Sequence, residues 1–168
     1  MVTSQYTHVT IPVADADVAA EFYMDVFGME EVPAVKFDTP VRWMDCGGLQ
    51  LHLLQFEVPA PEYHHFALHV DDFEEFYRRA RANEGATFEA LPNTEFDGDN
   101  PPIAYLPNGT VQAYLRDPFG NFIEVNYPDV EDIDPEVVPN LVERPDVSPD
   151  TPADGDIYGQ YGLQVAND

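Results

Sequence analysis

An internal duplication restricts the possible folds of this chain more than any other feature. One stretch, HVTIPVADADVAAEFY, begins at His8, and a second, HHFALHVDDFEEFYRRA, begins at His64. Each contains a histidine at the start of a strand-like run, then an aspartate that can cap a helix, then apolar residues at helical spacing. Setting His8 over His65 also sets Asp15 over Asp72. This repeat predicts two copies of one structural unit.

The remainder of each copy has the same order of elements. Strand-like runs rich in β-branched and aromatic residues follow each predicted helix, and CGG at 46–48 marks a tight turn between two of them. Setting Gly48 over Gly120 sets His52 over Glu124. We therefore predict an α+β fold in which two tandem βαβββ modules, residues 1–60 and 61–127, form an open, curled mixed sheet around a central cleft.

Residues 128–168 differ in composition from the two copies. They contain six of the sixteen prolines, eleven acidic residues and one arginine, and they show neither helical nor alternating periodicity. We predict that they form an acidic, proline-rich C-terminal extension that lies along the body of the protein or along a partner subunit.

The charge excludes some classes of partner. Thirty-two acidic and seven basic residues give a net charge of -25. Such a surface repels phosphate backbones and anionic lipids, so we expect neither nucleic acid nor a membrane as a partner. Dense acidic surfaces are tolerated where high salt screens their self-repulsion, which favours a halophilic source.

The expected location follows from what the sequence lacks. Cys46 is the single cysteine, so no disulfide can form within the chain, which suits a reducing compartment. The first residues have neither a basic segment nor a long apolar run, and no stretch approaches the length of a membrane span. We therefore expect a cytoplasmic protein.

Four side chains with metal-binding chemistry occupy equivalent strand positions in the two copies. A duplicated unit of this kind can bring equivalent inward-facing positions together in one cleft. Three imidazoles and one carboxylate would suit a single divalent ion, Zn²⁺, Ni²⁺, Co²⁺, Mn²⁺ or Fe²⁺, without selecting among them. The predicted metal ligands are His8, His52, His65 and Glu124.

Several neighbouring polar residues have simpler explanations. His64 points opposite to His65 if the register is right, although a shift of one residue would exchange them. His69 shares a face with His65 but lies about 13 Å along the strand, so a core position suits it better than ligation. Gln50 shares a face with His52, and we predict that it lines the cleft or binds the metal in place of His52. The aspartates at both helix starts are explained as caps.

These stretches resemble the vicinal oxygen chelate superfamily, which includes glyoxalase I, bleomycin resistance proteins and extradiol dioxygenases. The matching segments are HVTIPVADADVAAEFYMDVFGME, GGLQLHLL, HHFALHVDD and YLRDPFGNFIEV, which span about 120 residues. The resemblance implies paired βαβββ modules around a metal, a small-molecule substrate that chelates it through vicinal oxygens, and a homodimer. It also places the four predicted ligands at the ligand positions of the four-ligand members.

The resemblance leaves three activities open. The first is a metal-dependent lyase or isomerase of glyoxalase type with His52 as fourth ligand, although glyoxalase I usually has glutamate there. The second is an extradiol dioxygenase that uses His8, His65 and Glu124, with Tyr114 as a catalytic acid ten residues before the glutamate. The usual histidine of that signature is replaced by Tyr105. The third is a metal-free module that binds small molecules without turnover. We predict Tyr114 and Gln50 as the catalytic residues beside the metal.

Overall fold

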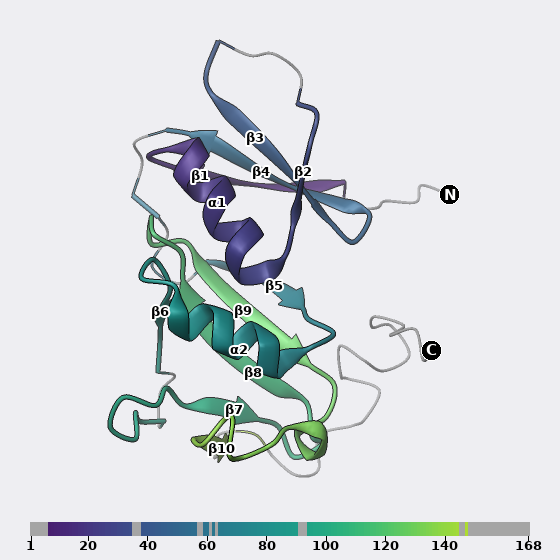
Figure 1. Cartoon of the computed structure of the whole chain (residues 1–168), viewed down its shortest axis with the longest axis vertical. Coiled ribbons are helices and arrows are strands. Elements are labelled where there is room, and N and C mark those ends of the chain that lie inside the picture. The colour runs from purple at the N-terminus through teal and green to yellow at the C-terminus, as the bar shows by residue number, and fades with distance from the viewer. Residues whose placement is uncertain are drawn as a thin grey trace. The chain divides into compact units, whose positions relative to one another are not determined.

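The computed structural model describes residues 7–34, 38–56, 59–60, 62, 64–90, 94–144 and 147 (Figure 1). Within these residues the chain forms two α-helices and ten strands, which lie in two mixed sheets. Neither sheet closes on itself, because each has two edge strands. The predicted α+β fold, with βαβββ order in the first copy, is confirmed.

The first sheet consists of four strands in the order β1-β4-β3-β2. Its only parallel pair is β1 with β4, which sets Thr10 opposite His52, and β3 joins β4 in antiparallel fashion, which sets Trp43 opposite His52. Residues two apart on a strand share a face, so the histidines of β1 and β4 lie on one face of this sheet. The strands are β1 (His8–Val13), β2 (Glu30–Val32), β3 (Val41–Cys46) and β4 (Leu49–Gln55).

Helix α1 (Ala16–Phe27) begins directly after Asp15, a cap that the sequence predicts, and ends before Gly28. The Asp15 side chain accepts hydrogen bonds from the backbone N–H groups of Asp17 and Val18, at 3.0 and 3.1 Å. At the other end Gly28 is left-handed, with φ 66°, and its N–H donates back to the last turn. The buried face of the helix consists of Ala16, Ala19, Ala20, Phe22, Tyr23 and Val26.

The turn between β3 and β4 explains the CGG sequence. Gly47 and Gly48 have φ values of 60° and 87°, which side-chain-bearing residues rarely adopt. Two consecutive left-handed residues suit a tight hairpin, and here they pair Cys46 with Leu49. The turn thereby sets the register that brings His52 opposite Trp43.

The second sheet follows the order β10-β7-β8-β9-β5, with β6 paired to β8. Helix α2 (Phe73–Ala82) belongs to the second copy, and its start is capped by Asp72, whose side chain accepts from the Glu75 N–H at 2.9 Å. The strands are β5 (His65–His69), β6 (Thr87–Phe88), β7 (Ile103–Tyr105), β8 (Val111–Arg116), β9 (Phe122–Tyr127) and β10 (Leu141–Glu143).

Part of the C-terminal extension is regular structure, which the sequence does not predict. Val130–Asp132 form a 3₁₀ turn, η1, and β10 pairs in parallel with β7. Ile133 and Val138 are buried, so this segment contributes to the core. A strand of three residues carries no periodicity of its own, because its stability comes from pairing with a neighbouring strand.

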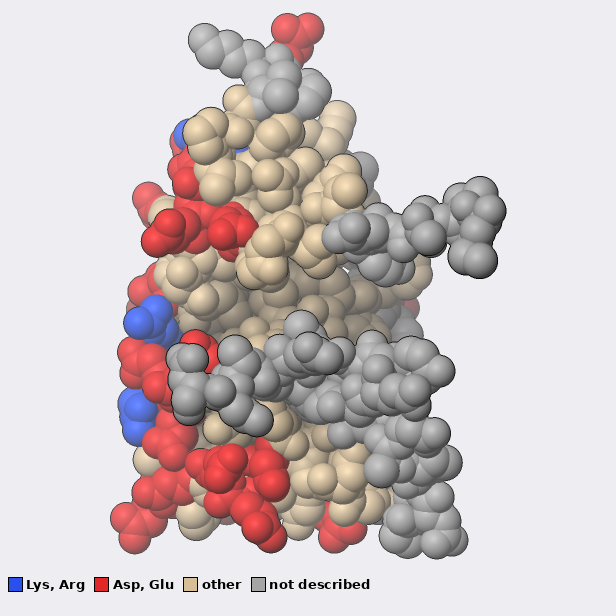
Figure 2. Space-filling model, turned by 90° about the vertical axis from the view of Figure 1, so that its right-hand side faces the viewer, with Lys and Arg blue, Asp and Glu red and all other residues tan. Residues whose placement is uncertain are grey.

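By residue contacts the chain divides into two compact units. The first comprises residues 1–66, 76–87 and 115–123, and the second comprises 67–75, 88–114 and 124–168. The division of the sequence into modules at residues 60 and 127 stays a prediction. Among the described residues, no helix is long and apolar enough to cross a membrane. Figure 2 shows that acidic side chains far outnumber basic ones on the visible face.

Candidate metal centre

Two of the four predicted ligands stack on one another in the first unit. The imidazoles of His8 on β1 and His52 on β4 have ring centroids 4.2 Å apart and planes inclined by only 11°. The indole of Trp43 on β3 stacks on His52 with centroids 4.4 Å apart and planes inclined by 7°. Because β4 lies between β1 and β3, His52 is enclosed between the other two rings.

Hydrogen bonds determine which nitrogen of each imidazole is engaged. His8 Nδ1 lies 3.0 Å from the Thr7 hydroxyl, so its Nε2 has no hydrogen bond within the described part of the chain. His52 Nε2 lies 2.9 Å from the Gln50 carbonyl oxygen, which can only accept, so this nitrogen carries the proton. Gln50, predicted beside the metal, therefore contacts a predicted ligand directly.

The stacked arrangement favours the neutral form of His52. Burial lowers the pKa of its imidazole, and the nearby His8 lowers it further because a positive charge on either ring repels one on the other. A neutral imidazole is the form that binds metal ions.

A cavity of about 710 Å³ adjoins the stacked rings. Both histidines and Gln50 line it, together with the indole of Trp43. Threonine hydroxyls and one carboxylate supply its other polar groups. The remaining lining residues are Thr10, Asp38, Thr39, Val41, Leu54 and Phe56. A volume of this size can enclose a small organic molecule.

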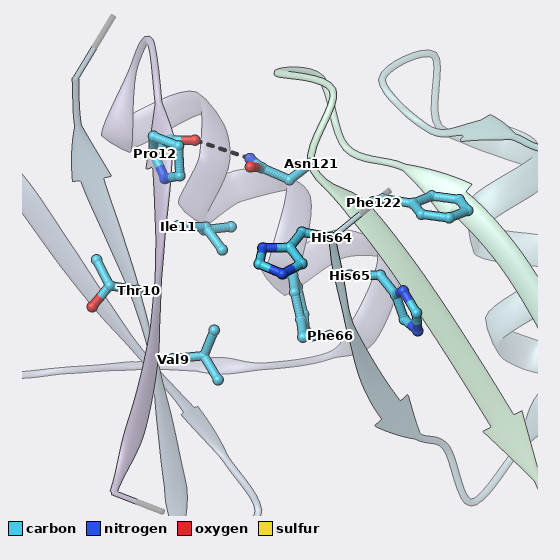
Figure 3. Close-up of a pocket in the computed structure, with 9 residues that line it drawn as sticks. All are labelled: Val9, Thr10, Ile11, Pro12, His64, His65, Phe66, Asn121 and Phe122. Atoms are coloured by element: carbon cyan, nitrogen blue, oxygen red, sulfur yellow. Dashed lines mark hydrogen bonds between the residues drawn. The ribbon is translucent and has the colours of Figure 1, made fainter. Parts of the chain in front are cut away.

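His65 on β5 belongs to the same unit but has a different environment. Its ring contacts Phe122 edge to face, with centroids 5.8 Å apart, and the Arg116 guanidinium lies 4.7 Å above the centre of that phenyl ring. In Figure 3, His65 points away from β1. The predicted ligand is therefore exposed and has an aromatic contact on one side.

His64 lies on the opposite side of β5, as predicted. Figure 3 shows its ring facing β1, where Val9 and Ile11 point toward it. These residues line a separate cavity of about 230 Å³, next to the hydrogen bond of 2.9 Å from the Asn121 side chain to the Pro12 carbonyl. Neighbouring strand residues alternate between faces, so the two histidines lie on opposite sides of the strand, and both line this cavity.

The fourth predicted ligand, Glu124 on β9, lies in the second unit with both carboxylate oxygens engaged. Tyr114 donates its hydroxyl proton to Oε2 at 2.9 Å, and Gln112 Nε2 donates to Oε1 at 3.0 Å. Tyr114 and Gln112 are two residues apart on β8, which neighbours β9, so both reach the carboxylate from one face. Tyr114, the other predicted catalytic residue, therefore also contacts a predicted ligand.

The amino-acid sequence establishes the family of the chain. A profile of the Glyoxalase/Bleomycin resistance protein/Dioxygenase superfamily matches residues 5–125, which include both copies. The chain belongs to this superfamily. The predicted resemblance to the vicinal oxygen chelate superfamily is confirmed, although nothing in the match addresses a halophilic source. No curated protein matches the chain significantly.

Solved structures of superfamily members resemble this chain. The lactoylglutathione lyase of Agrobacterium tumefaciens is 26% identical, with a TM-score of 0.52 over 74% of this chain and 93% of that one. The oxidase ChaP-H2 is 28% identical, with a TM-score of 0.59 over 74% of this chain and 94% of that one. The fosfomycin resistance protein FosX of Listeria monocytogenes, at 17% identity, covers 78% of this chain and 95% of its own, with a TM-score of 0.58. The last likeness concerns the fold alone.

The superfamily generally uses a divalent metal, and the donors in this chain fit one in chemistry. Imidazole nitrogens and a carboxylate held by two donors are typical of such sites. A metal binds an imidazole in the ring plane at about 2.0–2.1 Å. Because the rings of His8 and His52 are nearly parallel, both can bind one ion only after one ring turns. Within the described residues, no three His, Cys, Asp or Glu side chains are already grouped around a common point.

Three residues of these arrangements were not predicted. Trp43 is the single tryptophan of the chain, and its strand alternation places it on the face of His52, so the pattern contained a signal for it. Gln112 lies two residues before Tyr114, which places both on one face of a strand. Arg144, which donates to Gln112, lies in the extension, where no pattern indicates a site.

Proposed function

We propose that this superfamily member is a divalent-metal-dependent lyase or isomerase of glyoxalase type. It acts on a small substrate that presents vicinal oxygens. The observation that carries the proposal is the contact between His8 and His52, whose rings lie 4.2 Å apart on adjacent strands. This contact supports a four-ligand site. It places His52, which is a ligand only in the four-ligand site, next to His8, which is a ligand in both candidate metal sites. The proposed ligands are His8, His52, His65 and Glu124.

The side chains of the chain have distinct tasks in this proposal. When bound, the metal supplies Lewis-acid polarisation of substrate oxygens. Tyr114 and Gln112 hold the Glu124 carboxylate in one orientation through bonds of 2.9 and 3.0 Å. The Gln50 carbonyl oxygen accepts a hydrogen bond from the Nε2–H group of His52. This bond selects the tautomer whose Nδ1 is available to bind a metal. We also propose Gln50 and Tyr114 as the catalytic residues, with the Tyr114 hydroxyl as the group that can hold a proton near the substrate and the Gln50 amide as a hydrogen-bonding group.

The substrate class follows from the cavity beside the stacked rings. Val41, Leu54 and Phe56 supply apolar surface, and Trp43 supplies aromatic surface. An apolar substrate body can pack there while its oxygens face the histidines. The solved relatives named as a lactoylglutathione lyase and as an oxidase support an enzymatic role.

A second candidate function is an extradiol-type dioxygenase, which the bond between Tyr114 and Glu124 favours. In that case His8, His65 and Glu124 hold the metal, and His52 lies beside it without binding. Tyr114 keeps its hydroxyl on the carboxylate at 2.9 Å and serves as an acid near the metal.

Metal analysis of two proteins separates these candidates. The wild-type chain, reconstituted with Mn²⁺ or Co²⁺ and freed of unbound ion, should retain about one ion per chain. His52→Ala should lose most of this binding if the lyase proposal is right, and should retain it if only three ligands are used. Retention by His52→Ala, followed by ring cleavage of catechol on anaerobic Fe²⁺ loading and exposure to air, would establish the dioxygenase. If the wild type retains no metal, both candidates are wrong and the binding module is left.

We further propose that the protein works as a cytoplasmic homodimer on a small molecule, without nucleic acid or membrane partners. The net charge of -25 supports the exclusion of polyanionic partners. The same charge supports a halophilic source for the protein. The absence of a second cysteine supports a reducing compartment.

A further inference from the structure

We infer that Arg144, in the C-terminal extension, positions the Glu124 carboxylate through the side-chain amide of Gln112. The inference rests on the proposed function, because it assigns these residues to the orientation of a metal ligand. It gives the extension a task that lies outside the two copies of the repeat. Arg144 and Gln112 act here as positioning residues and contact neither substrate nor metal.

The order of donors and acceptors gives this chain of contacts a single direction. Arg144 Nη1 donates to Gln112 Oε1 at 3.1 Å, and Gln112 Nε2 donates to Glu124 Oε1 at 3.0 Å. A guanidinium can only donate and a carboxylate can only accept. An amide between the two must therefore turn its oxygen to the arginine and its nitrogen to the glutamate. Without Arg144, nothing in this chain of contacts opposes a rotation of the amide that would turn its oxygen toward the carboxylate.

The register of the second sheet makes this contact possible across an intervening strand. Ala104 on β7 pairs with Gln112 on β8 and with Val142 on β10. Paired residues share a face, and Arg144, two residues beyond Val142, shares it too. Ala104 is buried and has no side chain beyond Cβ, so it leaves room for the arginine to reach past β7.

The backbone around Arg144 is held at several points. The Arg144 N–H donates to the Tyr105 carbonyl at 2.9 Å, and the Asn140 carbonyl accepts from Ile103 at 2.9 Å. The Asn140 side chain donates to the carbonyls of Glu95 and Asn100, at 3.0 and 3.1 Å. The guanidinium therefore extends from a fixed backbone, so only the rotamer freedom of the arginine side chain is lost when it contacts Gln112.

The test uses full-length variants and two readouts, one of which does not depend on metal. Arg144→Met removes the donor and keeps much of the length, and Arg144→Lys restores a donor. Arg78→Met, the same change at an exposed position of α2, is the matched control. The first readout is the ¹H–¹⁵N signal pair of the Gln112 side-chain amide in metal-free protein. The second is the affinity for Mn²⁺.

We expect Arg144→Met to shift the Gln112 amide signals, to speed their hydrogen exchange, and to weaken Mn²⁺ binding about 10- to 100-fold. Arg144→Lys should recover part of both effects, and Arg78→Met should show neither. Gln112→Met should weaken Mn²⁺ binding as much as Arg144→Met, and the double variant should weaken it no further. If Arg144→Met does not fold, Arg144→Lys keeps the test decisive, because it should still shift the Gln112 amide signals relative to Arg78→Met.

The inference is wrong if Arg144→Met folds and leaves the Gln112 amide signals unchanged. It is also wrong if the losses from Arg144→Met and Gln112→Met simply add, because independent residues give additive effects. If the wild type binds no Mn²⁺, the proposed function fails. In that case the amide signals still decide whether Arg144 orients Gln112.

Discussion

The imidazole of His8 lies face to face with that of His52, with ring centroids 4.2 Å apart. Trp43 covers His52 with a second parallel ring, and it is the single tryptophan in the chain. Because one ion cannot lie in both ring planes while the imidazoles are parallel, its binding by both histidines would disturb this stack. The fluorescence of Trp43 therefore reports directly on His52.

We predict that Zn²⁺, which has no unpaired electrons that would quench the indole, changes the emission of Trp43 in proportion to the occupied sites. The wild type is titrated with Zn²⁺ while emission is recorded. His52→Ala removes the ring that Trp43 contacts, so its emission should differ before any metal is added and should respond little afterwards. An unchanged emission on saturation with Zn²⁺ in the wild type would show that His52 does not move.

The neighbouring histidines at positions 64 and 65 provide an internal comparison. We expect His65→Ala to weaken divalent-metal binding at least about tenfold, because one proposed donor is lost. His64→Ala should leave the affinity within about twofold, since Figure 3 shows its ring on the opposite side of β5. Calorimetric titration of both variants with Co²⁺ measures the difference. If His64→Ala weakened Co²⁺ binding and His65→Ala did not, His64 would be the ligand.

Removal of the Tyr114 hydroxyl tests its bond to Glu124. Tyr114→Phe keeps the buried ring and deletes the donor that contacts Oε2 at 2.9 Å. We expect metal affinity to fall about 10-fold, because the carboxylate loses a bond that orients it. Tyr105→Phe, the same deletion on β7, is the control and should bind metal as the wild type does. An affinity for Tyr114→Phe equal to that of Tyr105→Phe would contradict the prediction.

Asp117 stabilises the turn before β9 and gives a prediction about pH. Its buried carboxylate accepts hydrogen bonds from the Tyr23 hydroxyl and from the backbone N–H groups of Phe119 and Asn121, among others. Replacement by asparagine puts a donor in front of the Asn121 side-chain amide, which donates to Oδ2 at 2.8 Å. We expect Asp117→Asn to lower the free energy of unfolding by about 1–3 kcal/mol.

The sign of the pH dependence follows from the raised pKa of Asp117. Burial raises the pKa of this carboxyl above the ordinary value of 3.8, so the folded state holds the proton more tightly than the unfolded state. Stability from this group is then greatest below that value and falls as the pH rises through the raised pKa. The stability advantage of the wild type over Asp117→Asn should decline over this range. Urea unfolding of both proteins at constant salt measures it, and an advantage that grew with pH would contradict the raised pKa.

Much of the fold is determined locally, and local features can be read from the sequence. Asp15 and Asp72 cap helices because a short acceptor side chain suits exposed N–H groups there, and Gly28 ends α1 because it adopts a left-handed backbone easily. The repeat of the whole pattern predicted the α+β fold and the two strand-start histidines. Even the opposite orientation of His64 and His65 followed from the alternation of a strand.

Relations between distant strands depend on tertiary structure. Trp43 covers His52, and Gln112 meets Glu124, only because particular strands are neighbours in a particular register, and a slip of one residue would turn each side chain to the other face. Strand β2 ends at Val32, where its pairing with β3 also ends.

In the C-terminal extension, too, the sequence predicts some features and the tertiary structure decides others. Its composition indicated an acidic, irregular segment, and its sequence has no helical or alternating periodicity that would predict a strand. Three residues of the extension form β10 because they pair with the edge of β7. Unpaired backbone groups at a sheet edge gain hydrogen bonds from a segment that lies beside them. That pairing, and not the amino-acid pattern, placed Arg144 within reach of Gln112.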